Sequence, residues 1–103
     1  MTVYLNPRAR KVRGSHLLLI SCARCSHPIA TYRKVGESNL VKMFSDRIVD
    51  GTVDFSLDPG AVFCPGCQMR VATRYTTRAE GKTAYRLVPS AFHRRKVNAP
   101  LSD

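Results

Sequence analysis

The chain has 103 residues and carries a formal net charge of +10, from 17 lysine and arginine residues against seven acidic residues. This length allows one small domain, whose core needs support from a metal, a covalent link or a partner. No apolar run approaches the 18 or so residues of a membrane helix, so we expect no membrane span. The excess of positive charge favours an anionic partner, with nucleic acid ahead of an anionic membrane surface.

The first 15 residues contain basic side chains and no acid. These basic residues, which are candidate nucleic-acid contacts, are Arg8, Arg10, Lys11 and Arg13. Asn6-Pro7 and Gly14 interrupt any regular pattern, so we expect residues 1–15 to form an extended basic arm rather than a packed element. An arginine-rich start without acids is also typical of an organelle transit peptide. We rank that interpretation lower, because an apolar strand follows so soon.

Two Cys-x-x-Cys doublets hold all four cysteines of the chain, Cys22 with Cys25 and Cys64 with Cys67. A short apolar run at residues 16–21 is typical of a buried strand, and it leads directly into the first doublet. Two such doublets can place four thiolates at the corners of a tetrahedron, which is the arrangement of a closed structural zinc site. We therefore expect one Zn²⁺ per chain, bound by these four residues.

The four cysteines also have alternative uses. Two disulfides would need an oxidising compartment, whereas paired doublets with no secretory segment before them favour a metal and a cytoplasmic or other reducing intracellular location. A thioredoxin-like redox pair would need a βαβ pattern beside a doublet, and the sequence has none there. Tetrahedral sulfur ligation suits iron as well as zinc, so an iron site stays open. His27 lies two residues after Cys25, but with four thiolates present we expect it to stay a polar surface residue.

The stretch between Cys25 and Cys64 is longer than the usual spacing of a compact four-cysteine module, so it must contain a folded insertion. Residues 40–57 supply that insertion. β-Forming residues there flank Asp50-Gly51, a pair that favours a two-residue type I′ turn between antiparallel strands. We therefore expect an inserted hairpin over residues 40–57.

Residues 68–88 are expected to form another hairpin, with strands over residues 69–77 and 82–88. Basic and aromatic side chains interleave along it, and such a sheet can bind phosphates and stack bases. The competing interpretation is an ordinary solvated strand face with its tyrosines packed into the core. Residues 89–103 are expected to form a second basic tail. The candidate nucleic-acid contacts in the hairpin and the tail are Arg70, Arg74, Tyr75, Tyr85, Arg86, Arg94, Arg95 and Lys96.

The two doublets, each placed between short strands, resemble the two knuckles of a zinc ribbon. The second doublet, Cys64-Pro65-Gly66-Cys67, has the Cys-Pro-x-Cys form common in that superfamily. In layout the chain is similar to ribosomal zinc ribbons and to phage RNA-binding zinc-finger regulators of the Com type. With the expected strands, this resemblance implies a mostly β zinc ribbon over residues 16–88, with basic arms on both sides. It is specific for the metal site and unspecific for function, because zinc ribbons also serve as adaptors and as parts of enzymes.

We expect a protein that is not an enzyme and that binds nucleic acid, with RNA or a larger ribonucleoprotein assembly favoured over DNA. The Ser, His and Asp residues have no spacing that would bring them together as a catalytic group. The alternative function is a protein–protein adaptor or assembly subunit that uses residues 40–57 as its docking surface. Rubredoxin-like electron transfer is a third possibility, and it requires bound iron.

Overall fold

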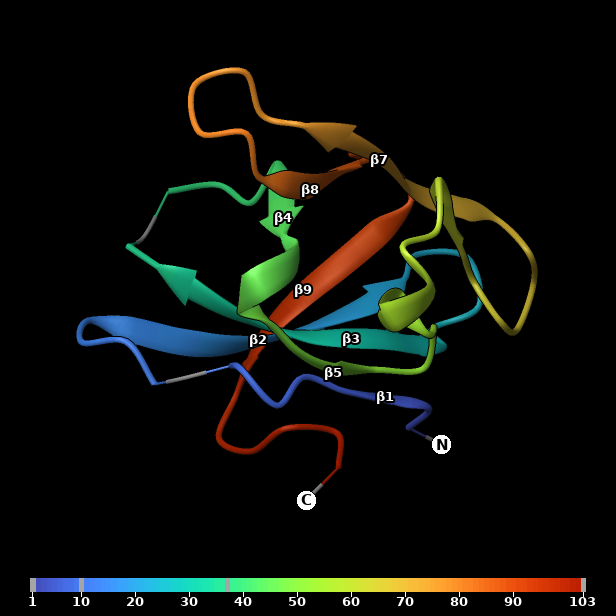
Figure 1. Ribbon diagram of the computed structural model, residues 1–103. Helices are drawn as coiled ribbons and strands as arrows, with labels where there is room; N and C mark the ends of the chain where they lie inside the picture. The colour runs from blue at the N-terminus through green and yellow to red at the C-terminus, as the bar shows by residue number, and fades with distance from the viewer. Residues whose placement is uncertain (1, 10, 37, 103) are drawn as a thin grey trace.

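The computed structural model describes residues 2–9, 11–36 and 38–102. Across these residues the chain is mostly β, as expected, with nine strands and two short 3-10 turns (Figure 1). The strands are β1 (Tyr4–Leu5), β2 (Ser15–Cys22), β3 (Pro28–Val35), β4 (Lys42–Phe44), β5 (Ile48–Gly51), β6 (Ala61–Phe63), β7 (Arg70–Thr76), β8 (Thr83–Leu87) and β9 (Phe92–Val97), and the turns are η1 (Ser45–Arg47) and η2 (Phe55–Leu57).

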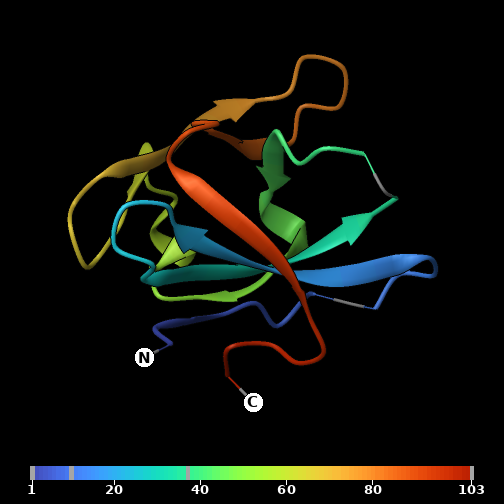
Figure 2. The same cartoon turned by 180° about the vertical axis from the view of Figure 1, so that it is seen from behind.

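The strands form two antiparallel sheets. The five-stranded sheet has the order β1-β5-β3-β2-β9, and the four-stranded sheet has the order β4-β8-β7-β6. Figures 1 and 2 show the four-stranded sheet lying over one face of the five-stranded sheet. β9 pairs with β2 at one edge of the five-stranded sheet. The loops that follow β2 and β6 lie at the same end of the molecule in both views.

The buried core lies between the two sheets. Ile20 and Tyr32 contribute to it from the five-stranded sheet, and Met43 and Tyr85 contribute from the four-stranded sheet. Phe55, in η2, meets the Tyr85 ring edge-on, with ring centroids 5.4 Å apart. Removing these large apolar surfaces from water is the main favourable contribution to folding outside the cysteine loops.

The hairpin expected over residues 68–88 is confirmed. β7 and β8 pair antiparallel, from Ala72 opposite Leu87 to Thr76 opposite Thr83. The N–H of Thr77 donates to the carbonyl oxygen of Lys82 at 2.8 Å and closes the connection.

The inserted hairpin expected over residues 40–57 does not form, so that prediction is wrong. β4 pairs with β8, whereas β5 pairs with β3 and with β1. Asp50 is fully buried within β5 and is not a turn residue. A Cβ atom at Gly51 would lie 2.8 Å from the Phe55 ring and 3.0 Å from the carbonyl oxygen of Ile29, so close packing requires this glycine. Placing the two strands in different sheets buries Met43 of β4 and Ile48, Asp50 and Gly51 of β5, and this outweighs the local turn preference.

Both terminal segments contribute strands, so the expectation of extended basic arms is wrong at these residues. β1 pairs with β5, and the side-chain amide of Asn6 donates to the carbonyl oxygen of Ile48 at 2.9 Å. β9 pairs with β2 from Phe92 to Val97 and forms one edge of the five-stranded sheet. An edge strand can keep charged side chains in water, which is why so basic a segment is compatible with a strand. Arg10 lies outside the described residues.

The segment after β9 is held by two buried polar side chains. The N–H of Leu101 donates to the hydroxyl of Thr31 at 3.1 Å, and the N–H of Ser102 donates to a carboxylate oxygen of Asp50 at 2.8 Å. Thr31 and Asp50 face each other across β3 and β5. The segment therefore provides one hydrogen-bond partner for a carboxylate that would be costly to bury alone.

Candidate metal centre

The four cysteines lie on two loops with the same backbone structure. The first loop joins β2 to β3 in the five-stranded sheet, and the second joins β6 to β7 in the four-stranded sheet. In each loop the N–H of the first cysteine donates to the carbonyl oxygen five residues later, and the N–H four residues later donates back, at 2.8–2.9 Å. Ser26 and Gln68 occupy equivalent positions with positive φ angles of 65° and 66°. The structure thus repeats one loop geometry in two separate sheets.

Backbone N–H groups in both loops also point at sulfur. The N–H of Arg24 lies 3.4 Å from Cys22 Sγ, and the N–H of Gly66 lies 3.3 Å from Cys64 Sγ. Such donors stabilise a sulfur atom that carries negative charge. The loops are therefore suited to present thiolates rather than neutral thiols.

The sulfur atoms of the two loops meet in one cluster. Cys22 Sγ lies 3.6 Å from Cys67 Sγ, Cys25 Sγ lies 3.4 Å from Cys64 Sγ, and all four atoms lie within 4.8 Å of one another. Four sulfurs at about 2.3 Å from a tetrahedral zinc ion are about 3.8 Å apart. None of the four cysteines is in a disulfide, because a bonded pair would be separated by about 2.05 Å. The geometry fits a single ion held by all four cysteines.

Charge repulsion within the cluster calls for a cation. Burial raises the pKa of Cys22, but backbone N–H groups of Cys25 and Arg24 and the neighbouring sulfurs outweigh it and lower this pKa to about 7. At Cys25 the N–H of His27 lowers the pKa, but Cys64 and the other sulfurs raise it to about 12. Once one sulfur is ionised, its neighbours retain their protons. A divalent cation removes this conflict by replacing the protons.

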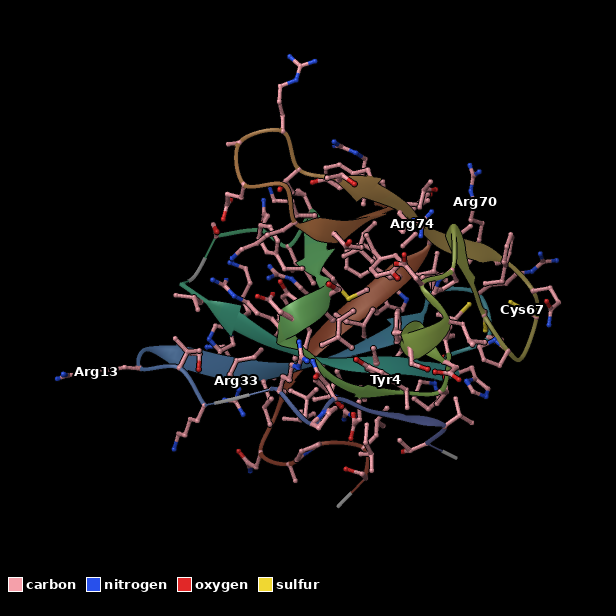
Figure 3. The ribbon with its side chains drawn as sticks, in the orientation of Figure 1. Tyr4, Arg13, Arg33, Cys67, Arg70 and Arg74 are labelled. Atoms are coloured by element: carbon pink, nitrogen blue, oxygen red, sulfur yellow. The ribbon has the colours of Figure 1, made fainter. Side chains whose placement is uncertain are left out.

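The inner sulfurs are shielded and the outer ones reach the surface. Cys22 and Cys64 are fully buried, Cys67 is half-buried and Cys25 is exposed. Figure 3 shows Cys67 on the loop that projects at one end of the molecule, with Arg70 rising from the strand that follows. The cluster therefore closes one end of the space between the sheets.

The basic candidate residues do not gather on one surface. Figure 3 shows Arg13 projecting from the end of the molecule opposite Cys67, whereas Arg70 lies near the cysteine loops. Arg74 is held by Asp58, through a 2.5 Å ion pair and a 2.8 Å hydrogen bond to the Asp58 carbonyl oxygen. The other candidates in the described residues, Arg8, Lys11, Arg86, Arg94, Arg95 and Lys96, have exposed side chains on β8, on β9 or before β2.

Tyr85, predicted as a nucleic-acid contact, lies in the core and not at the surface. Tyr85 is fully buried in the core, and burial raises its pKa to about 12, so it cannot stack a base. Tyr75 is half-buried, and the Arg86 guanidinium lies 4.8 Å from the centre of its ring.

The sequence analysis did not identify Phe44 or the cations around it as candidates. The strand period through β4 is the signal that could have found them, because it places Lys42 and Phe44 on one face.

Comparisons with known protein families, with characterised proteins and with solved structures find no match for this chain. The likeness to zinc ribbons therefore rests on the two doublets and on the loop geometry that they share. Among the described residues, no helix is long and apolar enough to cross a membrane.

Gly66 provides a test of the cluster geometry. A Cβ atom there would lie 3.1 Å from Cys25 Sγ and 3.2–3.3 Å from His27, whereas a Cβ at Gly60 would meet nothing within 4 Å. Because a metal-bound sulfur cannot retreat, Gly66→Ala should lower metal affinity about ten- to a hundred-fold, measured by competition with a chromophoric chelator. Gly60→Ala, the matched control, should bind as the original chain does. Equal affinity in both variants would contradict the cluster geometry.

Proposed function

We propose that this chain is a structural zinc protein built on two ribbon-type knuckles, and that it binds nucleic acid, with RNA preferred to DNA. The cluster of four cysteine sulfurs within 4.8 Å of one another carries the first part of the proposal. Four protein ligands fill a tetrahedral metal and leave no open position for water or substrate, which is the mark of a structural site. We accordingly propose no enzymatic activity for it.

The metal's contribution would be large on the scale of this fold. Structural zinc supplies an apparent binding free energy of about 10–16 kcal/mol at neutral pH, against a net stability of about 5–15 kcal/mol for a typical domain. The ligands come from both sheets, so the ion would join the two layers directly. Iron in the same site is the chemical alternative.

Elemental analysis of the purified protein should find one zinc ion per chain. Cys64→Ser should lose the metal and the folded state, because a hydroxyl is a weak replacement for a buried thiolate. A metal-free protein that stays folded with two disulfides would contradict the proposal. So would a coloured protein that holds iron as isolated.

Charge supports nucleic acid as the partner. A zinc ion with four thiolates carries a formal charge of 2−, so the metal-bound chain would still carry about +8. In the described part of the chain, the ion pairs to carboxylates engage Arg74 and Lys82. Arg8, Lys11, Arg13, Arg70 and Arg86 have no carboxylate partner there and are exposed. A polyanion can neutralise such side chains by releasing its counterions.

A protein-binding adaptor is the second candidate, and one observation favours it. Val41 and Leu57, both within residues 40–57, are 60% and 77% exposed, and Phe63 is 48% exposed. Exposed large apolar side chains can mark a docking surface when they are contiguous. If the chain does not bind single-stranded RNA at low salt, the adaptor function is favoured.

Binding of single-stranded RNA should weaken steeply as salt increases. If about four to six phosphates are neutralised, the log–log slope should be about −3 to −4 for a single strand. Arg70→Gln should make this slope shallower by about 0.7, the contribution of one phosphate contact on a single strand. Arg74→Gln, the control, should change it less because Asp58 already pairs with Arg74. Fluorescence anisotropy over a salt series measures the slope for each variant. The absence of binding at low salt would contradict the proposal.

A further inference from the structure

We infer that the outer face of the four-stranded sheet is a base-stacking platform for single-stranded RNA. The inference rests on the proposed nucleic-acid function and names the surface that would carry it. The platform consists of two aromatic rings and four cations from β4, η1, β7, β8 and the residue before β8. These residues are Phe44, Tyr75, Lys42, Arg47, Lys82 and Arg86.

The strand register places these side chains on one face. Phe44 lies opposite Ala84, and Ala84 lies opposite Tyr75, so the three form a row across β4, β8 and β7. Met43 and Tyr85, the neighbours in sequence, point to the other face and are fully buried in the core. Ala84 adds no bulk between the rings. Two strand spacings separate the backbones of Phe44 and Tyr75, about 9–10 Å, so the two positions can hold different bases.

The next row of the same face is cationic. Lys42 lies opposite Arg86, and Arg86 lies opposite Thr73. The Arg86 guanidinium lies over the Tyr75 ring, 4.8 Å from its centre. A guanidinium stacked on an aromatic ring presents a flat surface on which a base can stack, and its N–H groups can bind a phosphate.

Three further cations lie close to the Phe44 ring. Their distances from the ring centre are 5.3 Å for Lys42 Nζ, 5.5 Å for the Arg47 guanidinium and 5.8 Å for Lys82 Nζ. Asp46 and Glu80 approach Lys82 at 3.9 Å and 3.6 Å, so Lys82 is the cation whose charge is offset. Among the described residues, Lys42, Arg47 and Arg86 have no such carboxylate partner. The face thus keeps an excess of positive charge around its rings.

The two rings are not needed to complete the core. Phe44 and Tyr75 are half-buried, and in the described chain neither belongs to the buried apolar cluster or to the side chains packed against it. The Phe44 residue is held instead through its backbone, whose N–H donates to the Tyr32 hydroxyl at 2.9 Å. Aromatic rings placed at a charged surface without a packing role are suited to contact a partner.

Single-stranded RNA is the partner that can use both the aromatic rings and the cations around them. The flat face of an unpaired base can stack on a ring while the phosphates on either side contact the cations, and neither contact depends on sequence. Bases within a duplex are already stacked on each other and cannot reach the rings. An acidic peptide would satisfy the cations but would leave the rings without a matching group.

The test replaces each ring without changing charge. Phe44→Leu and Tyr75→Leu should each weaken binding of a short oligouridylate about five- to a hundred-fold, with an unchanged salt slope because no cation is lost. Phe63→Leu is the matched control. Phe63 is an exposed aromatic residue of the same sheet, opposite Arg70 and five residues along β7 from Tyr75. Zinc content and thermal unfolding of each variant establish that the fold is intact.

A direct signal of stacking is available from tyrosine fluorescence. The chain has four tyrosines and no tryptophan. Tyr32 and Tyr85 are buried, and Tyr4 lies in the five-stranded sheet with its ring 5.6 Å from that of Phe55. Oligouridylate that stacks on the platform should therefore quench emission in the original chain and quench it less in Tyr75→Leu.

The outcomes distinguish failure of the platform from failure of the proposed function. Unchanged affinity in both leucine variants, with steep salt dependence retained, would overturn the platform and leave nucleic-acid binding intact. No binding of RNA by the original chain would overturn both. Tighter binding of a polyglutamate peptide than of oligouridylate, with no loss in Phe44→Leu, would overturn the platform in favour of an acidic protein partner.

Discussion

The contact between the two cysteine loops is the interaction on which the rest of the structure depends. One loop belongs to each sheet, and their four sulfur atoms lie within 4.8 Å of one another. Neutral thiols gain little from such an arrangement, and thiolates repel each other unless a cation lies between them. A chain of 103 residues has a small core, so a bound metal at this point can decide whether the two sheets stay together.

The core uses the inner faces of the two sheets, and the outer face of the four-stranded sheet carries charged side chains. Tyr85 and Met43 point inward and are fully buried, which commits the alternate residues of β8 and β4 to the outer face. Half-buried Phe44 and exposed Arg86 therefore lie on the outer face as a consequence of how the core is filled. In this sense the metal would organise a surface that it does not touch.

The parts of the fold that could be predicted are those encoded locally. The cysteine doublets and the β7–β8 hairpin depend on residues close in sequence, and both are found where expected. The Asp50-Gly51 pair misled the prediction because Gly51 is required by the Phe55 ring, a contact that a turn signal does not contain. β9 looked like a solvated tail because its partner, β2, lies far away in sequence. Tyr85 was assigned to the surface because interleaved charges do not reveal which face meets the other sheet.

Amide hydrogen exchange before and after chelation tests the central claim most directly. β3 and β7 follow the two cysteine loops and lie in different sheets, so they report on both layers. If a metal joins the sheets, the amides of β3 and β7 should lose protection together on chelation and recover when one equivalent of Zn²⁺ is returned. Protection that persists in both strands of the metal-free protein would contradict the account.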